Sequence, residues 1–127
     1  MNDARIAIPS TLPGGLEAGV GAHFGHCDLY TIVDVKGGRI VAATTLPNVP
    51  HQQGGCLAPV NHLAQNGVNV LIAGGMGMRP LMGFDQAGIE VYRGTDAASV
   101  GAAVEALLKG DLDRFTREFT CGGGGQQ

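Results

Sequence analysis

The pattern of apolar and polar positions predicts a chain in which strands and helices alternate. Five stretches rich in β-branched and other apolar residues are typical of strands, namely residues 5–9, 29–35, 39–45, 68–73 and 89–92. Lys36-Gly37-Gly38 separates the second stretch from the third and is a tight hairpin signal. The fourth stretch carries no charged residue, which favours a parallel strand buried on both faces.

Helical periodicity appears in the segments that follow the third, fourth and fifth strands. We predict helices over residues 56–65 and 79–87, and a third helix that begins at Thr95 or Asp96 and ends at Gly110. The apolar face of the first helix consists of Leu57, Val60 and Ala64, and His62 lies outside this face and should be exposed to solvent. The third helix has its apolar face at Val100, Val104, Leu107 and Leu108. A short last helix follows, with Leu112, Phe115 and Phe119 on one side.

This order of elements is β-β-β-α-β-α-β-α, and its connectivity locates a candidate site. If the first three strands form a meander, right-handed crossovers make strands one, three, four and five parallel to one another. Ligands of such sheets bind beyond the carboxyl ends of the parallel strands. Four connections gather there, over residues 10–28, 46–55, 74–80 and 93–94, and the first is far longer than an ordinary hairpin loop.

Composition indicates one domain and argues against several classes of partner. The chain has 127 residues and a formal net charge of −3, with no cluster of Lys and Arg, so we expect no nucleic-acid partner. No apolar run is long enough for a membrane span, and the start lacks a signal-peptide pattern. Three widely spaced cysteines favour a reducing cytoplasm. We expect a single domain over residues 1–119 and a disordered Gly-rich tail over residues 120–127.

The strongest chemical signal is the glycine loop, defined as residues 74–80, between the fourth strand and the second helix. Glycines let a ligand approach the backbone, and a helix N-terminus with a nearby arginine attracts anions. The loop lacks the Lys-Ser/Thr of a P-loop, and Pro80 replaces the third glycine of a dinucleotide fingerprint. A tight turn that binds nothing is the alternative, and both methionines could be core fillers instead of ligand contacts. The candidate binding residues are Gly74, Gly75, Met76, Gly77, Met78 and Arg79.

Soft metal ligands fall on the same edge of the predicted sheet. The candidates are His23, His26, Cys27, His51 and Cys56, with Cys121 of the tail as a weaker one. A cysteine at the start of a helix has a lowered thiol pKa, which is the reason to single out Cys56. Each candidate also has a structural interpretation: the histidines could bond to loop backbone, and Cys27 could be a small buried residue. No pair of cysteines has CxxC spacing, so a zinc ribbon has no support.

The chain resembles the dinitrogenase iron–molybdenum cofactor biosynthesis family, which includes NifX, NafY, the C-terminal domain of NifB and the orange protein. The resemblance rests on Pro9-Ser10, His23-Phe24-Gly25 and residues 30–34, 67–80 and 87–91. It implies a ribonuclease H-like α/β fold, with a five-stranded mixed sheet in the order 3-2-1-4-5, strand 2 antiparallel, flanked by helices. It also implies a carrier of a metal–sulfur cluster without catalysis. Cys27 departs from the pattern, where we expect a small residue other than cysteine.

Together these features predict a protein that binds and carries a metal–sulfur cluster or its precursor, whether iron–sulfur, iron–molybdenum or molybdenum–copper. Its partners would be cluster donor and acceptor proteins, and it would be a monomer or weak homo-oligomer. A nucleotide- or phosphate-binding regulatory module is the alternative, because the glycine loop would serve it equally well. A nuclease needs several convergent carboxylates, whereas only Asp28 and Glu17 fall near this edge.

Overall fold

Five strands and three helices make up this computed structural model, which describes residues 3–21, 27, 29–48, 57–94, 97–116 and 118. In chain order they are β1 (Ala4–Ser10), β2 (Leu29–Lys36), β3 (Arg39–Pro47), α1 (Ala58–Gln65), β4 (Val70–Ala73), α2 (Met78–Ala87), β5 (Glu90–Arg93) and α3 (Val100–Leu108). No helix in these described segments has the length and apolar character that a membrane crossing requires.

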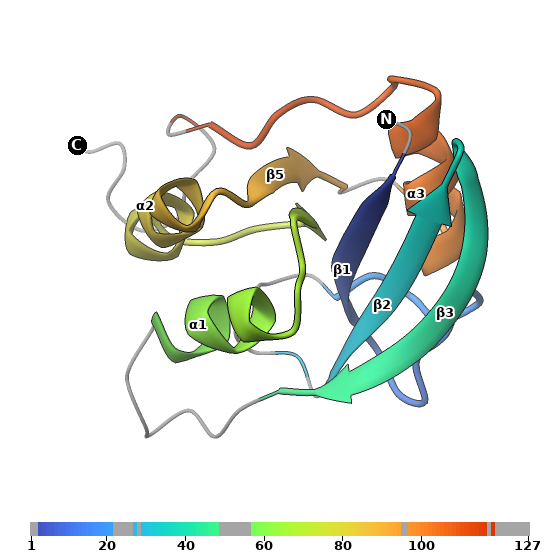
Figure 1. Cartoon of the computed structure of the whole chain (residues 1–127), viewed down its shortest axis with the longest axis horizontal. Helices are drawn as coiled ribbons and strands as arrows, with labels where there is room; N and C mark the ends of the chain where they lie inside the picture. Colours follow the sequence, from blue (N-terminus) through green and yellow to red (C-terminus); the bar gives the residue numbers. More distant parts are fainter. Residues whose placement is uncertain are drawn as a thin grey trace.

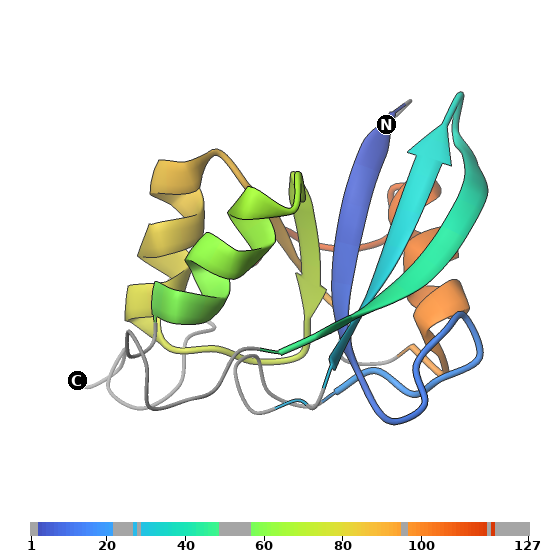
Figure 2. The ribbon, with the colours of Figure 1, turned by 60° about the horizontal axis from the view of Figure 1, so that its bottom comes forward.

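The strands form one mixed sheet in the order β3-β2-β1-β4-β5, which confirms the expected order (Figure 1). β2 is antiparallel to both of its neighbours, whereas β1, β4 and β5 are parallel. The parallel strands therefore end at one edge, which we call the carboxyl edge and which lies at the bottom of Figure 2. The connection from β4 to α2 runs along this edge.

Helices cover both faces of the sheet, because the inner strands are apolar on both sides. Ile6 and Ile8 of β1 pack with α3, whereas Ala7 between them belongs to the core under α1 and α2. All four residues of β4 are buried, as its uncharged sequence predicts. The result is three layers, with α1 and α2 on one side of the sheet and α3 on the other (Figures 1 and 2).

Two predicted helix starts lie too early in the chain. α1 begins at Ala58 instead of Cys56, and its buried residues are Pro59, Val60 and Leu63, so Leu57 and Ala64 do not form the inner face as expected. The N-cap of α3 is Ser99, not Thr95 or Asp96. Its side chain accepts a hydrogen bond from the amide of Ala102 at 3.1 Å, which satisfies a first-turn donor.

The predicted short last helix is also wrong over its described residues, because the chain runs beside β5 as an extended segment. Tyr92 and Arg114 form an antiparallel bridge, and the amide of Arg93 donates to the carbonyl of Asp113 at 2.8 Å. Leu112 packs on the α3 side of the sheet and Phe115 on the α1–α2 side. Opposite faces at an odd spacing are what a strand produces, whereas a helix puts residues three apart on one face.

Candidate functional site

The glycine loop connects β4 to α2 at the carboxyl edge. Gly77 is the N-cap of α2, with φ −81° and ψ 173°, and no side chain within the described residues caps this helix. Pro80 occupies the third helical position, within the first turn, where an amide has no intrahelical partner in any case. Arg79 is exposed beside this turn. Backbone amides and an arginine thus meet at one helix terminus, which is an arrangement that attracts anions.

The described atoms around Gly77 would accommodate a side chain at this position. If a Cβ were added there, the nearest described atom would be Cδ of Pro80 at 3.8 Å, an ordinary contact distance. The backbone conformation is one that any residue adopts, so neither strain nor packing requires glycine at this position. Gly77 is half-buried, and its backbone takes part in an isolated β-bridge, so part of its hydrogen-bonding capacity is used within the chain.

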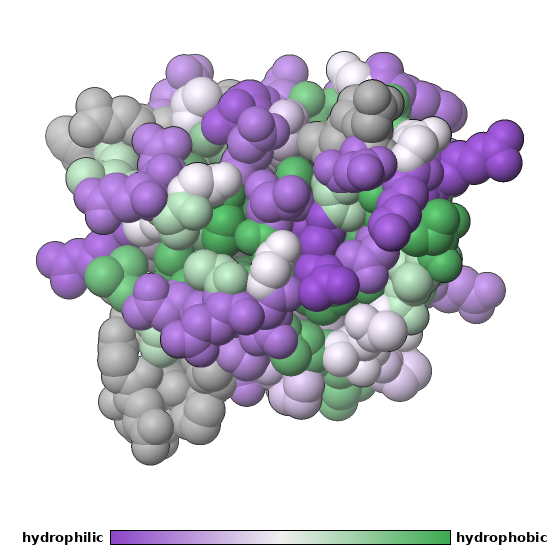
Figure 3. All heavy atoms as spheres, in the orientation of Figure 1, coloured by the Kyte–Doolittle hydropathy of each residue, from purple (hydrophilic) through white to green (hydrophobic). Residues whose placement is uncertain are grey.

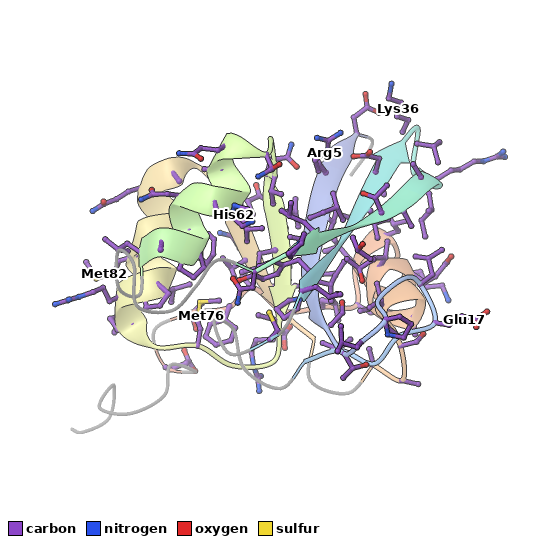
Figure 4. The ribbon with its side chains drawn as sticks, turned by 90° about the horizontal axis from the view of Figure 1, so that it is seen from below. Arg5, Glu17, Lys36, His62, Met76 and Met82 are labelled. Carbon is purple, nitrogen blue, oxygen red and sulfur yellow. The ribbon has the colours of Figure 1, made fainter. Side chains whose placement is uncertain are left out.

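The two methionines of the loop face different surroundings. Met76 is completely buried and packs in the core with Phe84 and Tyr30, so its side chain fills the interior (Figure 4). Met78 is half-buried and lines a shallow groove between α1 and α2, together with Arg79 and Met82. Met76 can therefore reach a ligand in this conformation only through its backbone, whereas Met78 presents part of its side chain next to Arg79.

Cys27 is the one predicted metal ligand that lies within the described residues. Its side chain is partly buried against the core under α1 and α2, at the entrance of β2. The side-chain amide of Asn48 donates to the Cys27 carbonyl at 3.0 Å and lies 3.8 Å from the sulfur, while its oxygen accepts from the Tyr30 hydroxyl at 3.1 Å. Asn48 therefore joins the end of β3 to the start of β2 beside the thiol.

The Tyr30 hydroxyl remains a hydrogen-bond donor over the whole physiological range. Its ring is completely buried, and this burial raises the pKa of the hydroxyl well above its ordinary value. The charge of Cys27 and a hydrogen bond to Cys27 raise the pKa further. Neither Tyr30 nor Asn48 stands out in the sequence. A polar aromatic residue in an apolar strand and an asparagine after a strand are common, and only the pairing of β2 with β3 brings them together.

His62 connects α1 to the same end of β3. Its Nε2 lies 2.9 Å from the carbonyl oxygen of Pro47, so with the proton on Nε2 the ring donates a hydrogen bond. His62 thus lies at the surface as expected, half-buried, but its ring also makes a contact that the sequence did not predict. The reason is the path of the chain, which brings the end of β3 against α1 (Figure 4).

The first half of the long loop after β1 is closed instead of open. The amides of Val100 and Gly101, at the start of α3, donate to the carbonyls of Ala18 and Leu16 at 2.8 and 2.7 Å. The hydroxyls of Ser10 and Thr31 are buried 2.8 Å apart beneath this segment. Residues 11–21 thus cover the N-terminus of α3, whereas no described segment covers the N-terminus of α2 in the same way.

The other predicted metal ligands lie outside the described residues, and their roles stay predictions: His23, His26, His51, Cys56 and Cys121. Across the described segments, no group of three or more His, Cys, Asp or Glu side chains is placed to hold a metal ion. Glu17 lies on the α3 side, away from Met76 (Figure 4). The start of α1 at Ala58 also places Cys56 before the N-cap, which weakens the argument for a lowered thiol pKa.

Comparison with protein families gives a match over most of the chain. Residues 3–110 match the family model described as dinitrogenase iron-molybdenum cofactor. An uncharacterized protein of Methanocaldococcus jannaschii, MJ0580, is 31% identical over 97 residues, and the match covers 73% of this chain and 80% of that protein.

Solved structures with the same fold include the apo form of the orange protein from Desulfovibrio gigas. It is 27% identical with a TM-score of 0.77, and the match covers 89% of this chain and 93% of that one. A Thermotoga protein provisionally assigned as NifB is 29% identical with a TM-score of 0.70, over 91% of this chain and 98% of that one. PH0822, at 23% identity and a TM-score of 0.74, covers 87% of this chain and 96% of its own and shows the fold alone.

Proposed function

Because the chain belongs to the dinitrogenase iron-molybdenum cofactor family, we propose that it binds a metal–sulfur cluster or its precursor and carries it between proteins. The family match over residues 3–110 is the observation that carries this proposal. Iron–sulfur, iron–molybdenum and molybdenum–copper species are the cargo we consider, since each is a bulky anion with a sulfur surface. We also propose that the fold is ribonuclease H-like and that the chain works in the reducing cytoplasm.

The glycine loop is the proposed seat of the cargo. At the N-terminus of α2 the amides of the first turn and Arg79 favour negative charge, and Gly77 adds no side chain beside them. Hydrogen bonds from such donors to a charged acceptor each contribute about 1.5–3 kcal/mol. Gly74, Gly75 and the backbone of Met76 belong to the same turn, and Met78 adds a soft, polarizable side chain at its rim.

Cys27 is the proposed replaceable ligand. Its sulfur lies at the carboxyl edge, next to the side-chain amide of Asn48. The hydroxyl of Tyr30 in turn donates a hydrogen bond to the side-chain oxygen of Asn48. A thiolate prefers soft metals, and hydrogen bonds to a ligating sulfur tune how firmly it holds them. One such ligand together with an amide cradle gives loose coordination, which suits a carrier that must release its cargo to an acceptor protein. We propose no catalytic step.

A phosphate- or nucleotide-binding regulatory role is the second candidate. The same observation favours it, because amides at a helix N-terminus and Arg79 would bind a phosphate as readily as a thiometallate. The soft side chains distinguish the two, since a phosphate makes no use of the Cys27 thiol or of Met78.

The test is anaerobic reconstitution of the apo protein. The protein is incubated with tetrathiomolybdate and Cu(I), or with iron and sulfide, and then passed through a gel-filtration column. We expect a coloured protein with a charge-transfer band and metal in a fixed ratio to chain. A colourless, metal-free protein whose Tm rises with nucleotide or inorganic phosphate would support the second candidate and overturn the first.

A further inference from the structure

β3 leaves one edge of the sheet without a partner strand in the described part of the chain. It is a nine-residue strand at the end of the sheet order, and most of its side chains are exposed on both faces. No other described strand pairs with the hydrogen-bonding groups that point away from β2. An edge of this kind is a template for the addition of a strand.

The opposite edge of the sheet, at β5, is covered by a segment of the chain itself. Beside β5 the extended segment around Arg114 supplies two backbone hydrogen bonds, including the one from the Phe115 amide to the Val91 carbonyl at 2.8 Å. This cover lies beyond residues 3–110, which match the family model. Only the β3 edge thus remains open within the described structure.

The open part of β3 is short and carries no charge. A register shift opposite Asp34 and Val35 leaves Val41 as a bulge near one end, and Pro47, which has no amide proton, lies at the other. Between them the sequence is Ala42-Ala43-Thr44-Thr45-Leu46. Pale and green atoms prevail over this end of β3 in Figure 3. Edges that avoid pairing use charged side chains, especially lysine, and this stretch has none.

We propose that β3 pairs antiparallel with β3 of a second copy, around a two-fold axis at Thr44. This register places Thr44 opposite Thr44 of the other copy, Ala42 opposite Leu46 and Ala43 opposite Thr45. Small and Thr–Thr cross-strand pairs are compatible with close approach. The single charged residue of the strand, Arg39, then lies five positions from the axis in each copy. The two arginines are roughly 33 Å apart at about 3.3 Å per residue, beyond the screening length at physiological salt.

Charge and symmetry favour this occupant over other arrangements. A parallel pairing would put the two Arg39 side chains next to each other, whereas the antiparallel one separates them. A two-fold contact uses the same surface on both copies and closes after two chains. The carboxyl edges of the two copies point in opposite directions, so both glycine loops stay open. The ladder is short and buries less than the roughly 1,200 Å² of stable interfaces, so the dimer forms only at high concentration.

Sedimentation velocity of the full chain, from micromolar to millimolar concentration, tests the proposal. We expect the mass to rise with concentration from that of a 13.0 kDa monomer to twice that value. Thr44→Lys and Thr44→Glu each place like charges opposite each other. Each should weaken association at least about fivefold, the factor that one close like-charge contact corresponds to in water. Circular dichroism verifies that both variants fold.

The charge-swap mixture decides whether Thr44 lies at the axis. Mixed in equal amounts, Thr44→Lys and Thr44→Glu should associate at least as well as the wild type, because opposite charges then face each other. Gln86→Lys, on the exposed side of α2, is the control and should not change association. A wild type that stays monomeric at millimolar concentration overturns the proposal. A dimer that neither Thr44 variant weakens, or that the mixture does not restore, overturns it as well.

Discussion

Replacement of Gly77 by valine separates cargo binding from folding. The valine Cβ meets no described atom closer than Cδ of Pro80 at 3.8 Å, and φ −81° with ψ 173° is a conformation that β-branched residues adopt readily. The substitution therefore adds an isopropyl group at the N-cap of α2 without a clash with any described atom. We expect it to obstruct the approach of any ligand to the first-turn amides of α2.

The expected effect of Gly77→Val on stability is smaller than its effect on cargo affinity. Glycine is a better N-cap than valine, but valine restricts the unfolded chain, so the net change in unfolding free energy should stay within about 1 kcal/mol. For a chain of this length that corresponds to a change in Tm of about 4 °C or less. Loss of one charge-assisted hydrogen bond to the cargo costs about 1.5–3 kcal/mol, which lowers affinity roughly 10- to 100-fold.

The assay measures metal retained per chain after anaerobic reconstitution and gel filtration, with the Tm of the apo protein measured in parallel. Gly77→Ala should give an intermediate loss, because a methyl group obstructs less. Gly19→Ala is the control, because it lies in the closed segment over α3, where its Cβ would be 3.4 Å from Oγ1 of Thr11. Full metal retention in Gly77→Val, with an unchanged Tm, would refute the assignment of the glycine loop as the seat.

Four further variants test the remaining parts of the argument. Arg79→Ala should lower metal retention roughly 10-fold or more if the cargo is held as an anion. The double variant Cys27→Ser with Cys56→Ser should keep some metal but release it faster. Complete loss of metal in the double variant alone would mean that the thiols dominate binding. Tyr30→Phe should flatten the loss of stability at alkaline pH, because an unfolded tyrosine ionises above its ordinary pKa of 10.0 while buried Tyr30 stays protonated. Between about pH 8 and about pH 11, the free energy of unfolding of the wild type should fall by about 1.4 kcal/mol more than that of the variant. Urea titrations at the two pH values measure this difference, and equal losses in both proteins would contradict the prediction. Phe115→Ala should lower the free energy of unfolding by about 3–5 kcal/mol, since that ring is 4% exposed, and a change below about 1 kcal/mol would mean that the segment beside β5 is not part of the core.

The sequence by itself determined the element order and much of the topology. Long-range pairing followed from local patterns: uncharged β4 had to be buried on both faces, and right-handed crossovers then fixed its direction relative to β1. The position of the glycine loop at the carboxyl edge followed from the same reasoning. These features depend on periodicity and handedness, which every short segment carries in its own residues.

Element boundaries and the last segment were decided by tertiary contacts. Ser99 caps α3 instead of Thr95 or Asp96, where any of the three side chains could have served as a cap. Residues 111–116 have apolar positions compatible with a short helix, but the free edge of β5 offered backbone partners, and Phe115 found a place in the core. Local sequence carries no information about such an edge, because the partner strand lies some twenty residues away.

The surroundings of the candidate site were also decided only by the tertiary structure. Sequence reasoning placed Cys27 and the glycine loop at one edge, but it could not show that Asn48 bonds both to Cys27 and to Tyr30. Nor could it show that Leu16 and Ala18 close the N-terminus of α3 while the N-terminus of α2 has no side-chain cap within the described residues. Both helices begin with amides that have no partner within the helix, and the difference between them is which loop packs against each. That depends on distances between segments far apart in the chain, which only the folded backbone sets.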